Sequence, residues 1–167
     1  MESPALWRQA YAKGHAKAGA TTTGVAPVTM EGFSRERVAK MIARLKEHRC
    51  RFKPVRRAYI PKAHGTSRPR GVPSGDDKRV QEVVRALLER LYEPVFSDYA
   101  QGFRPPRSCH TALRHMQRTW SGVIWLVDLD IPSCYDRSDH EVLITLLARK
   151  IEDHRGIALI KATLKAG

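Results

Sequence analysis

The most informative stretch of this chain is Trp125–His140, which reads W-L-V-D-L-D-I-P-S-C-Y-D-R-S-D-H. The nearly continuous apolar run Val123–Asp130 has β-branched content and predicts a buried strand. Asp128 and Asp130 are two residues apart, so they would share one face of that strand. Hard cations such as Mg²⁺ prefer carboxylate oxygens, so either acid is a candidate metal ligand. The alternative is that both acids only end the strand.

An aromatic ring follows at a distance that separates the two acids. Tyr135 lies five residues after Asp130, where a ring can lie under the sugar of a nucleotide bound at the strand end. Ser133 occupies the same offset from Asp128 and offers no ring. The spacing therefore favours Asp130 as the ligand.

Composition favours a nucleic-acid partner. The chain has 167 residues, a net charge of +13 and 42% hydrophobic residues, which indicates a folded protein with one core or two small ones. Arginine outnumbers lysine twenty to ten, and its planar fork grips phosphate in two-point contacts. The segment Arg44–Arg79 has twelve basic and three acidic residues. A solvated surface and an anionic membrane are the alternative explanations of this charge.

Other classes of protein receive no support. No apolar run approaches eighteen residues, so we expect no membrane-spanning segment, and the N-terminus lacks the apolar core of a secretory signal. The three cysteines are far apart and form no C-x-x-C motif. They predict free thiols in a reducing cytosol, and hence a cytoplasmic protein without a membrane partner.

The local patterns predict mostly helices and one hairpin. Residues 1–33 are expected to be a loosely structured lead-in. Strands are predicted over Phe52–Ile60 and Arg68–Val72, joined by a turn. Helices are expected over Ser34–His48, Asp76–Leu91 and Ile157–Leu164. Two more are expected to begin at caps, one at Ser108 and one at a capping box formed by Ser138 and Glu141.

Two further segments are candidate binding sites. In the basic hairpin, Lys62 and Arg68 flank a tight turn, so both can converge on one phosphate group; a solvated hairpin tip is the alternative. The loop G-F-R-P-P-R suits stacking on a base and gripping a backbone; a connector with Phe103 buried is its alternative. The residues expected to contact nucleic acid are Arg56, Arg57, Arg70, Gly102, Phe103, Arg104 and Pro105.

In this order and spacing, these segments resemble the N-terminal part of a group II intron-type reverse transcriptase, an intron-encoded maturase. The resemblance is carried by I-P-K…R-P-R-G-V-P…D-K-R-V-Q (Ile60–Gln81), by L-Y-E-P-V-F…G-F-R-P-P-R-S-C-H-T-A-L (Leu91–Leu113) and by Trp125–Leu143. The resemblance implies an α/β fold: a fingers subdomain of helices and a basic hairpin over residues 34–120, then the start of a right-hand polymerase palm over 121–167.

The resemblance also implies chemistry. Lys62 and Arg68 would contact the incoming triphosphate. Asp130, with the Ile131 carbonyl beside it, would be the first metal ligand, and Tyr135 would be the sugar gate. The expected reaction is two-metal nucleotidyl transfer with Mg²⁺ on an RNA template. In it, the 3′-oxygen of a DNA primer attacks the α-phosphate of a dNTP. Ile131 and Tyr135 would also line the nucleotide site.

Some residues depart from the family pattern, and one motif is missing. Pro132, Ser133 and Cys134 stand where the family has a basic or small residue, then Gly, then Phe. The second metal-ligand motif, Y-x-D-D, does not occur in this sequence. A single strand carboxylate cannot hold two Mg²⁺ ions, so we expect a truncated enzyme that is inactive alone. The alternatives are a non-catalytic basic RNA-binding module and a decayed remnant.

Overall fold

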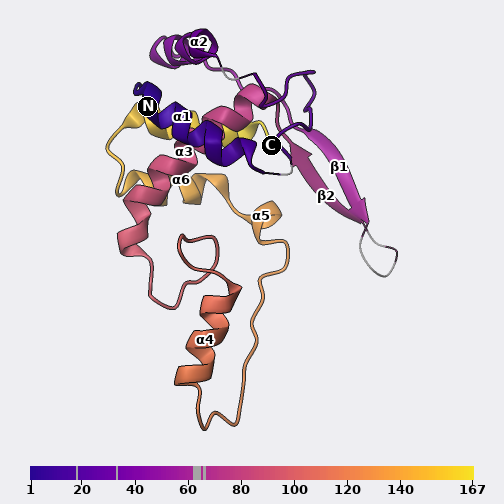
Figure 1. Ribbon diagram of the computed structural model, residues 1–167, viewed down its shortest axis with the longest axis vertical. Coiled ribbons are helices and arrows are strands. Elements are labelled where there is room, and N and C mark those ends of the chain that lie inside the picture. Colours follow the sequence, from indigo (N-terminus) through magenta and orange to yellow (C-terminus); the bar gives the residue numbers. More distant parts are fainter. Residues whose placement is uncertain (18, 33, 62–64, 66) are drawn as a thin grey trace. The chain divides into compact units, whose positions relative to one another are not determined.

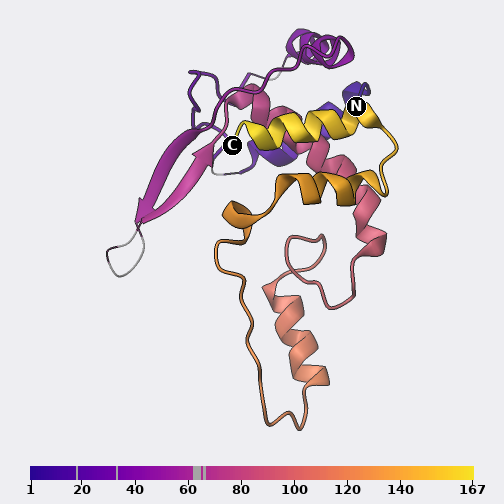
Figure 2. The ribbon, with the colours of Figure 1, turned by 180° about the vertical axis from the view of Figure 1, so that it is seen from behind.

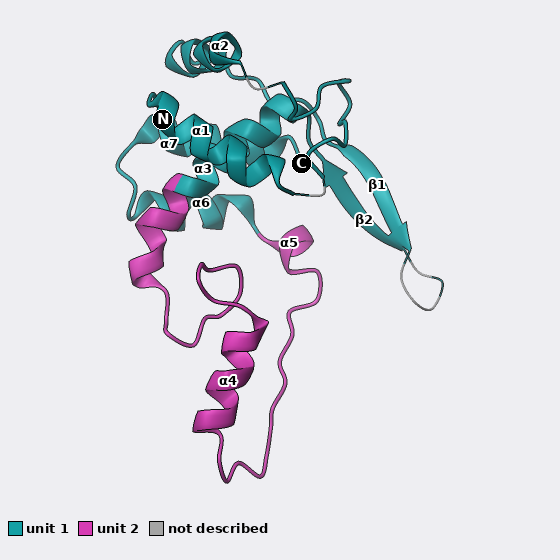
Figure 3. Cartoon of the chain, in the orientation of Figure 1, with its two compact units in different colours: residues 1–86, 139–167 teal, residues 87–138 magenta. Residues whose placement is uncertain are grey.

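The computed structural model describes residues 1–17, 19–32, 34–61, 65 and 67–167. Contacts divide the chain into two compact units, one formed by residues 1–86 and 139–167 and the other by residues 87–138 (Figure 3). In chain order the first unit holds α1 (Pro4–His15), α2 (Arg35–Lys46), β1 (Arg56–Pro61), β2 (Ser67–Val72), most of α3 (Gly75–Tyr92), α6 (His140–Ala148) and α7 (His154–Lys165). The second unit holds the end of α3, the 3₁₀ turn η1 (Glu93–Val95), α4 (Cys109–Thr119) and α5 (Cys134–Arg137).

Helices and one hairpin build the first unit (Figure 1). The hairpin predicted from turn residues is confirmed: β1 pairs antiparallel with β2, and Tyr59 lies opposite Pro69. α2 begins at the predicted Ser34 cap, whose side chain accepts a hydrogen bond from the Arg37 N–H. In the part of the chain that the structure describes, β1 and β2 form a two-stranded sheet, and no other strand pairs with them.

The apolar core lies in the first unit. Trp7 of α1 and Val83 of α3 are almost fully buried there. Residues 1–33, expected to be loosely structured, therefore contain a helix that contributes to the core. The segment after α1 adds to it as well. The buried apolar side chains are Leu6, Trp7, Ala10, Ala20, Ala26, Met30, Val38, Met41, Val80 and Val83.

The end of α7 reaches the base of the hairpin (Figure 2). The Val55 N–H, one residue before β1, donates to the Ala166 carbonyl at 3.0 Å. α6 and α7 are joined by a short turn and bridged by an ion pair between Lys161 and Glu141 at 2.8 Å. The base of the hairpin is thus fixed by residues from the far end of the sequence.

Two further sequence predictions about backbone structure are wrong. Val123–Asp130, predicted to be a buried strand, is irregular and exposed; Trp125 is 87% exposed. A strand needs a hydrogen-bonded neighbour, and none of the described residues pairs with this segment. The cap of α6 is Asp139 rather than Ser138: Asp139 accepts from the Glu141 N–H at 2.8 Å. Ser138 donates instead to the Cys134 carbonyl.

Candidate nucleic-acid interface

The register of the hairpin divides its side chains between two faces. Side chains alternate along a strand, and directly opposed residues share a face. One face, here called the arginine face, consists of Arg56, Ala58, Ile60, Arg68, Arg70 and Val72. The other, here called the tyrosine face, consists of Arg57, Tyr59, Pro61, Ser67, Pro69 and Gly71.

The arginine face is exposed and strongly basic. Arg68 and Arg70 lie two residues apart on β2, and both are exposed. No described acidic side chain forms an ion pair with either of them. Residues 51–75 contain seven basic residues and no acid. Uncompensated arginines at strand spacing offer an anion, such as a phosphate chain, several charge-assisted contacts.

A segment before α2 holds the base of this hairpin. Arg56 Nε donates to the Thr23 carbonyl at 3.1 Å. Lys78 Nζ, on α3, donates to the carbonyls of Gly19 and Thr22 at 2.9 and 2.5 Å. Burial, and then the neighbouring charge of Arg56, lowers the pKa of Lys78. Residues 19–31, here called the strap, are therefore tied to both β1 and α3.

Arg79 is the main anchor of the strap. Its side chain is 3% exposed, and Nη2 donates to the carbonyls of Met30 and Glu31 at 2.5 and 2.7 Å. Nη1 forms an ion pair with Asp76 at 2.9 Å. Burial, and then the charge of Arg37, lowers the pKa of Arg79. Arg79 lies next to Val80 on the buried side of α3. An arginine beside the apolar stripe of a helix was therefore the sequence signal for this anchor.

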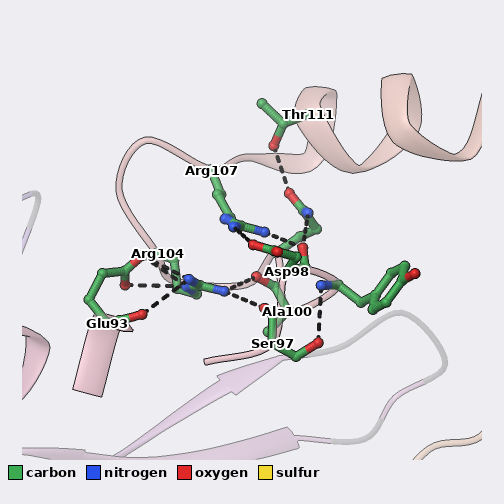
Figure 4. A network of polar contacts seen from close by, with 9 residues as sticks. Glu93, Ser97, Asp98, Ala100, Arg104, Arg107 and Thr111 are labelled. Carbon is green, nitrogen blue, oxygen red and sulfur yellow. Dashed lines mark hydrogen bonds and ion pairs between the residues drawn. The ribbon is translucent and has the colours of Figure 1, made fainter. Parts of the chain in front are cut away.

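In the second unit, the G-F-R-P loop is organised by Arg104 (Figure 4). The guanidinium donates to the Glu93 carboxylate at 2.9 to 3.2 Å and to the carbonyls of Ser97 and Ala100 at 2.6 and 2.9 Å. It also lies 5.3 Å from the centre of the Phe96 ring. Arg104 is 7% exposed. Its side chain therefore binds other residues of the loop. The sequence had predicted instead that Arg104 would face solvent and contact a nucleic-acid backbone.

The same loop displays Phe103. This side chain is 99% exposed, contrary to the alternative that buries it, and its φ of 57° lies in the left-handed region. Gly102 precedes it, and an added Cβ there would meet no atom within 4 Å. Arg107 pairs with Asp98 at 2.9 Å and closes the loop. The loop thus presents a ring on a fixed backbone.

The acidic segment is exposed throughout. Asp128, Asp130 and Ile131 lie in the irregular segment, and Ile131 is 69% exposed. Tyr135, on the short helix α5, is 76% exposed. Among the described residues no group of three His, Cys, Asp or Glu side chains could hold a metal ion. The residues present therefore do not fit a complete Mg²⁺ site.

Comparison with known proteins identifies the family. The sequence model described as "Reverse transcriptase (RNA-dependent DNA polymerase)" matches residues 60–165. The chain belongs to this family. It is 45% identical over 165 residues to "Group II intron-encoded protein LtrA" of Lactococcus lactis subsp. cremoris, covering 98% of this chain and 28% of that protein. The resemblance to group II intron-type reverse transcriptases is confirmed.

Two further relatives are eukaryotic proteins. The chain is 44% identical over 158 residues to "Uncharacterized 91 kDa protein in cob intron" of Schizosaccharomyces pombe, covering 95% of this chain and 20% of that protein. It is 32% identical over 93 residues to "Nuclear intron maturase 1, mitochondrial" of Arabidopsis thaliana, covering 56% and 13%. The chain thus spans less than a third of the length of these relatives.

The site residues predicted from the sequence fall into separate groups. Arg56, Arg68 and Arg70 share the arginine face, whereas Arg57 lies on the other face of the hairpin. Lys62 lies outside the described residues. The loop and the acidic segment belong to the second unit. None of the described helices is long and apolar enough to cross a membrane. The three cysteines are free, as predicted.

Proposed function

We propose that this chain supplies nucleotide- and nucleic-acid-binding residues to an RNA-directed DNA polymerase of the group II intron type. The observation that carries the proposal is the arginine face. It exposes Arg68 and Arg70 without an acidic partner among the described residues, within a segment that the family model matches. Such a face suits the phosphates of a dNTP or of an RNA template and DNA primer.

The site residues have distinct proposed roles. Lys62 and Arg68 bind the triphosphate, and Tyr135 contacts the sugar. Asp130 and the Ile131 carbonyl contribute ligands to a Mg²⁺ site. Phe103 and the neighbouring Gly102 and Pro105 face the template and primer, while Arg104 supports them from within the loop. We assign residues 34–120 to the fingers and 121–167 to the palm.

The chain alone is proposed to be inactive as a polymerase. Asp130 stands in an exposed, irregular segment, and the described residues contain no metal-binding group of three. The test is primer extension with primed RNA template, dNTPs and Mg²⁺. The 167-residue chain is compared with a version extended by a Y-x-D-D segment. Extension of the primer by the short chain would contradict inactivity, and an extended version that tolerates Asp130→Ala would contradict the ligand role.

A second candidate function is a non-catalytic RNA-binding module in a reducing compartment such as the cytosol. The arginine face favours this second function, because exposed arginines can bind RNA phosphates without a metal ion. Titration of structured RNA across a salt series tests it, since each phosphate contact releases a counterion. We expect affinity to fall steeply with salt. Affinity that is independent of salt would contradict RNA binding by this face.

A further inference from the structure

The tyrosine face of the hairpin has no role in the function proposed above. Tyr59 is 62% exposed, although large rings are usually buried in proteins. Its directly opposed residue is Pro69, and its neighbours along β1 on this face are Arg57 and Pro61. Among the residues that the structure describes, no third strand pairs with the hairpin. The ring is therefore accessible on a basic arm.

We propose that the tyrosine face is a stacking site for an unpaired nucleobase of single-stranded RNA. Tyr59 supplies the ring, and Arg57 grips the adjoining phosphate. This inference rests on the proposed binding of nucleic acid by the hairpin and adds a second surface to it. Aromatic rings beside a basic groove are the usual means of holding single strands, because every base has a π-face.

The spacing of the residues fits this assignment. Arg57 and Tyr59 are two residues apart on β1, so their Cα atoms lie about 7 Å apart along the strand. Pro69 places a flat ring opposite Tyr59, where cross-strand Cβ atoms lie about 5 Å apart. At the base of the same face Gly71 has no side chain, and Val55 fills its place: an added Cβ would lie 2.9 Å from Val55 Cγ2.

Charge decides the class of partner. The hairpin and its flanks, residues 51–75, have seven basic residues and no acid. Arg57 is exposed, and no described acidic side chain pairs with it. A purely apolar partner would leave this charge uncompensated at the interface, whereas a base with its phosphate satisfies ring and cation together. Duplex RNA shields its bases within the stack, so the site selects unpaired strands.

The central test compares two RNAs and four proteins, and the variants Arg57→Gln and Arg70→Gln are measured beside them. Fluorescence anisotropy measures the affinity of a single-stranded oligonucleotide and of the same oligonucleotide with abasic positions. The proteins are the wild-type chain, Tyr59→Leu, Tyr59→Phe and, as a matched control, Tyr99→Leu. Tyr99 is also exposed, at 78%, but lies in the other unit. Circular dichroism verifies that each variant is folded.

We expect Tyr59→Leu to weaken binding of the intact oligonucleotide about five- to a hundredfold and to leave the abasic one unchanged. Tyr59→Phe should restore binding, and Tyr99→Leu should have no effect. The salt dependence should be unchanged in Tyr59→Leu, whereas Arg57→Gln should reduce its slope by about 0.7.

Three results overturn the inference. Equal loss for both oligonucleotides, or no loss in Tyr59→Leu, excludes stacking on Tyr59. If Arg70→Gln still weakens binding in that case, the proposed function stands and only the tyrosine face is wrong. If the wild-type chain binds neither oligonucleotide, both proposals fail together.

Discussion

Arg104, which is buried, forms an ion pair with the partly exposed Glu93, in which Nη2 lies 2.9 Å from Oε1 and Nε lies 3.1 and 3.2 Å from the two carboxylate oxygens. The second unit, residues 87–138, has no fully buried apolar side chain among its described residues. Polar contacts around Arg104 therefore define the conformation of its loop. An ion pair of this kind is weak support for overall stability but fixes geometry well.

Arg104→Met should leave the Glu93 carboxylate and the carbonyls of Ser97 and Ala100 without their donor. We expect a local loss of about 2 kcal/mol, because removing Arg104 leaves several hydrogen-bond acceptors of the loop without their donor. Hydrogen exchange of the backbone amides of residues 97–107 should accelerate. Asp98→Asn is the control: Asp98 is 95% exposed, so this loss should stay below about 1 kcal/mol. Unchanged exchange in Arg104→Met would contradict the anchoring role.

Arg79→Met should release the strap from α3. The carbonyls of Thr29, Met30 and Glu31 lose the donor that the buried Arg79 supplies. Asp76 loses an ion-pair partner. We therefore expect the free energy of unfolding to fall by about 3 kcal/mol. Limited proteolysis with thermolysin should then cut within residues 19–31. Lys40→Met is the control, because Lys40 is 68% exposed in its pair with Glu36. Equal protease resistance in both variants would count against the anchor.

Gly75→Ala should destabilise the first unit. A Cβ on Gly75 would lie 2.2 Å from the Thr29 carbonyl oxygen and 2.7 Å from that of Val28, and both atoms are backbone. We expect a loss of about 2 kcal/mol in urea denaturation. Gly19→Ala is the matched control, since no atom lies within 4 Å of its added Cβ. It should be neutral or stabilising by up to about 1 kcal/mol.

Glu82 should make stability depend on pH in the acid range. Burial alone raises the pKa of Glu82, but hydrogen bonds from Lys17 and Arg85 outweigh it and lower that pKa. The stabilisation is thus present above the unfolded pKa of about 4.3 and is lost as pH falls through the lower, folded pKa. Glu82→Gln should cost about 1 kcal/mol at pH 7.

Urea denaturation of wild-type and Glu82→Gln protein at pH 7, 5 and 3 measures this dependence. The difference between the two proteins should shrink toward pH 3. Glu36→Gln is the control: Glu36 is 77% exposed, so its difference at pH 7 should be smaller. A difference for Glu82→Gln that grows on acidification would show that the sign is wrong.

Cys50 should react more slowly than the other two cysteines. Burial, and then the Asp77 carboxylate, raises the pKa of the Cys50 thiol, and only the thiolate is the nucleophile. Cys109 and Cys134 are exposed. Alkylation with iodoacetamide at pH 8, followed by peptide mass spectrometry, should label Cys50 several times more slowly. In urea the three rates should converge. Preferential labelling of Cys50 in the folded protein would refute this.

Local patterns were sufficient where the cause of structure is local. The Ser34 cap, the apolar stripe of α3 and the turn residues of the hairpin each act within a few residues, and those elements formed. The first strand begins at Arg56 and not at the predicted Phe52. The α6 start failed by one residue because Asp139 competes with Ser138 for the same N–H groups. Such competition between adjacent cap residues is settled by backbone geometry.

Structure that depends on distant partners was not predictable in this way. The helix Pro4–His15 is stabilised by the burial of Trp7. It was not predicted, because the Gly- and Thr-rich residues that follow it are typical of a loop. The segment Val123–Asp130 has the composition of a strand but no described partner. Arg104 was predicted to contact nucleic acid at the surface. Nothing in the neighbouring sequence indicates that Glu93, eleven residues earlier, is its partner. The basic residues of the hairpin were predicted, but their division between two faces required the register.

The hydrogen bond from Val55 to the Ala166 carbonyl has a consequence for synthesis of the chain. The two strands can pair as soon as Val72 has been added, because all their partners are local. The base of the arm gains this last backbone acceptor only when α7 has been made. Contacts between residues so far apart in sequence close late during folding. On the ribosome the hairpin and its contacts with the strap would therefore form first, and the backbone contact with the end of α7 would be added last.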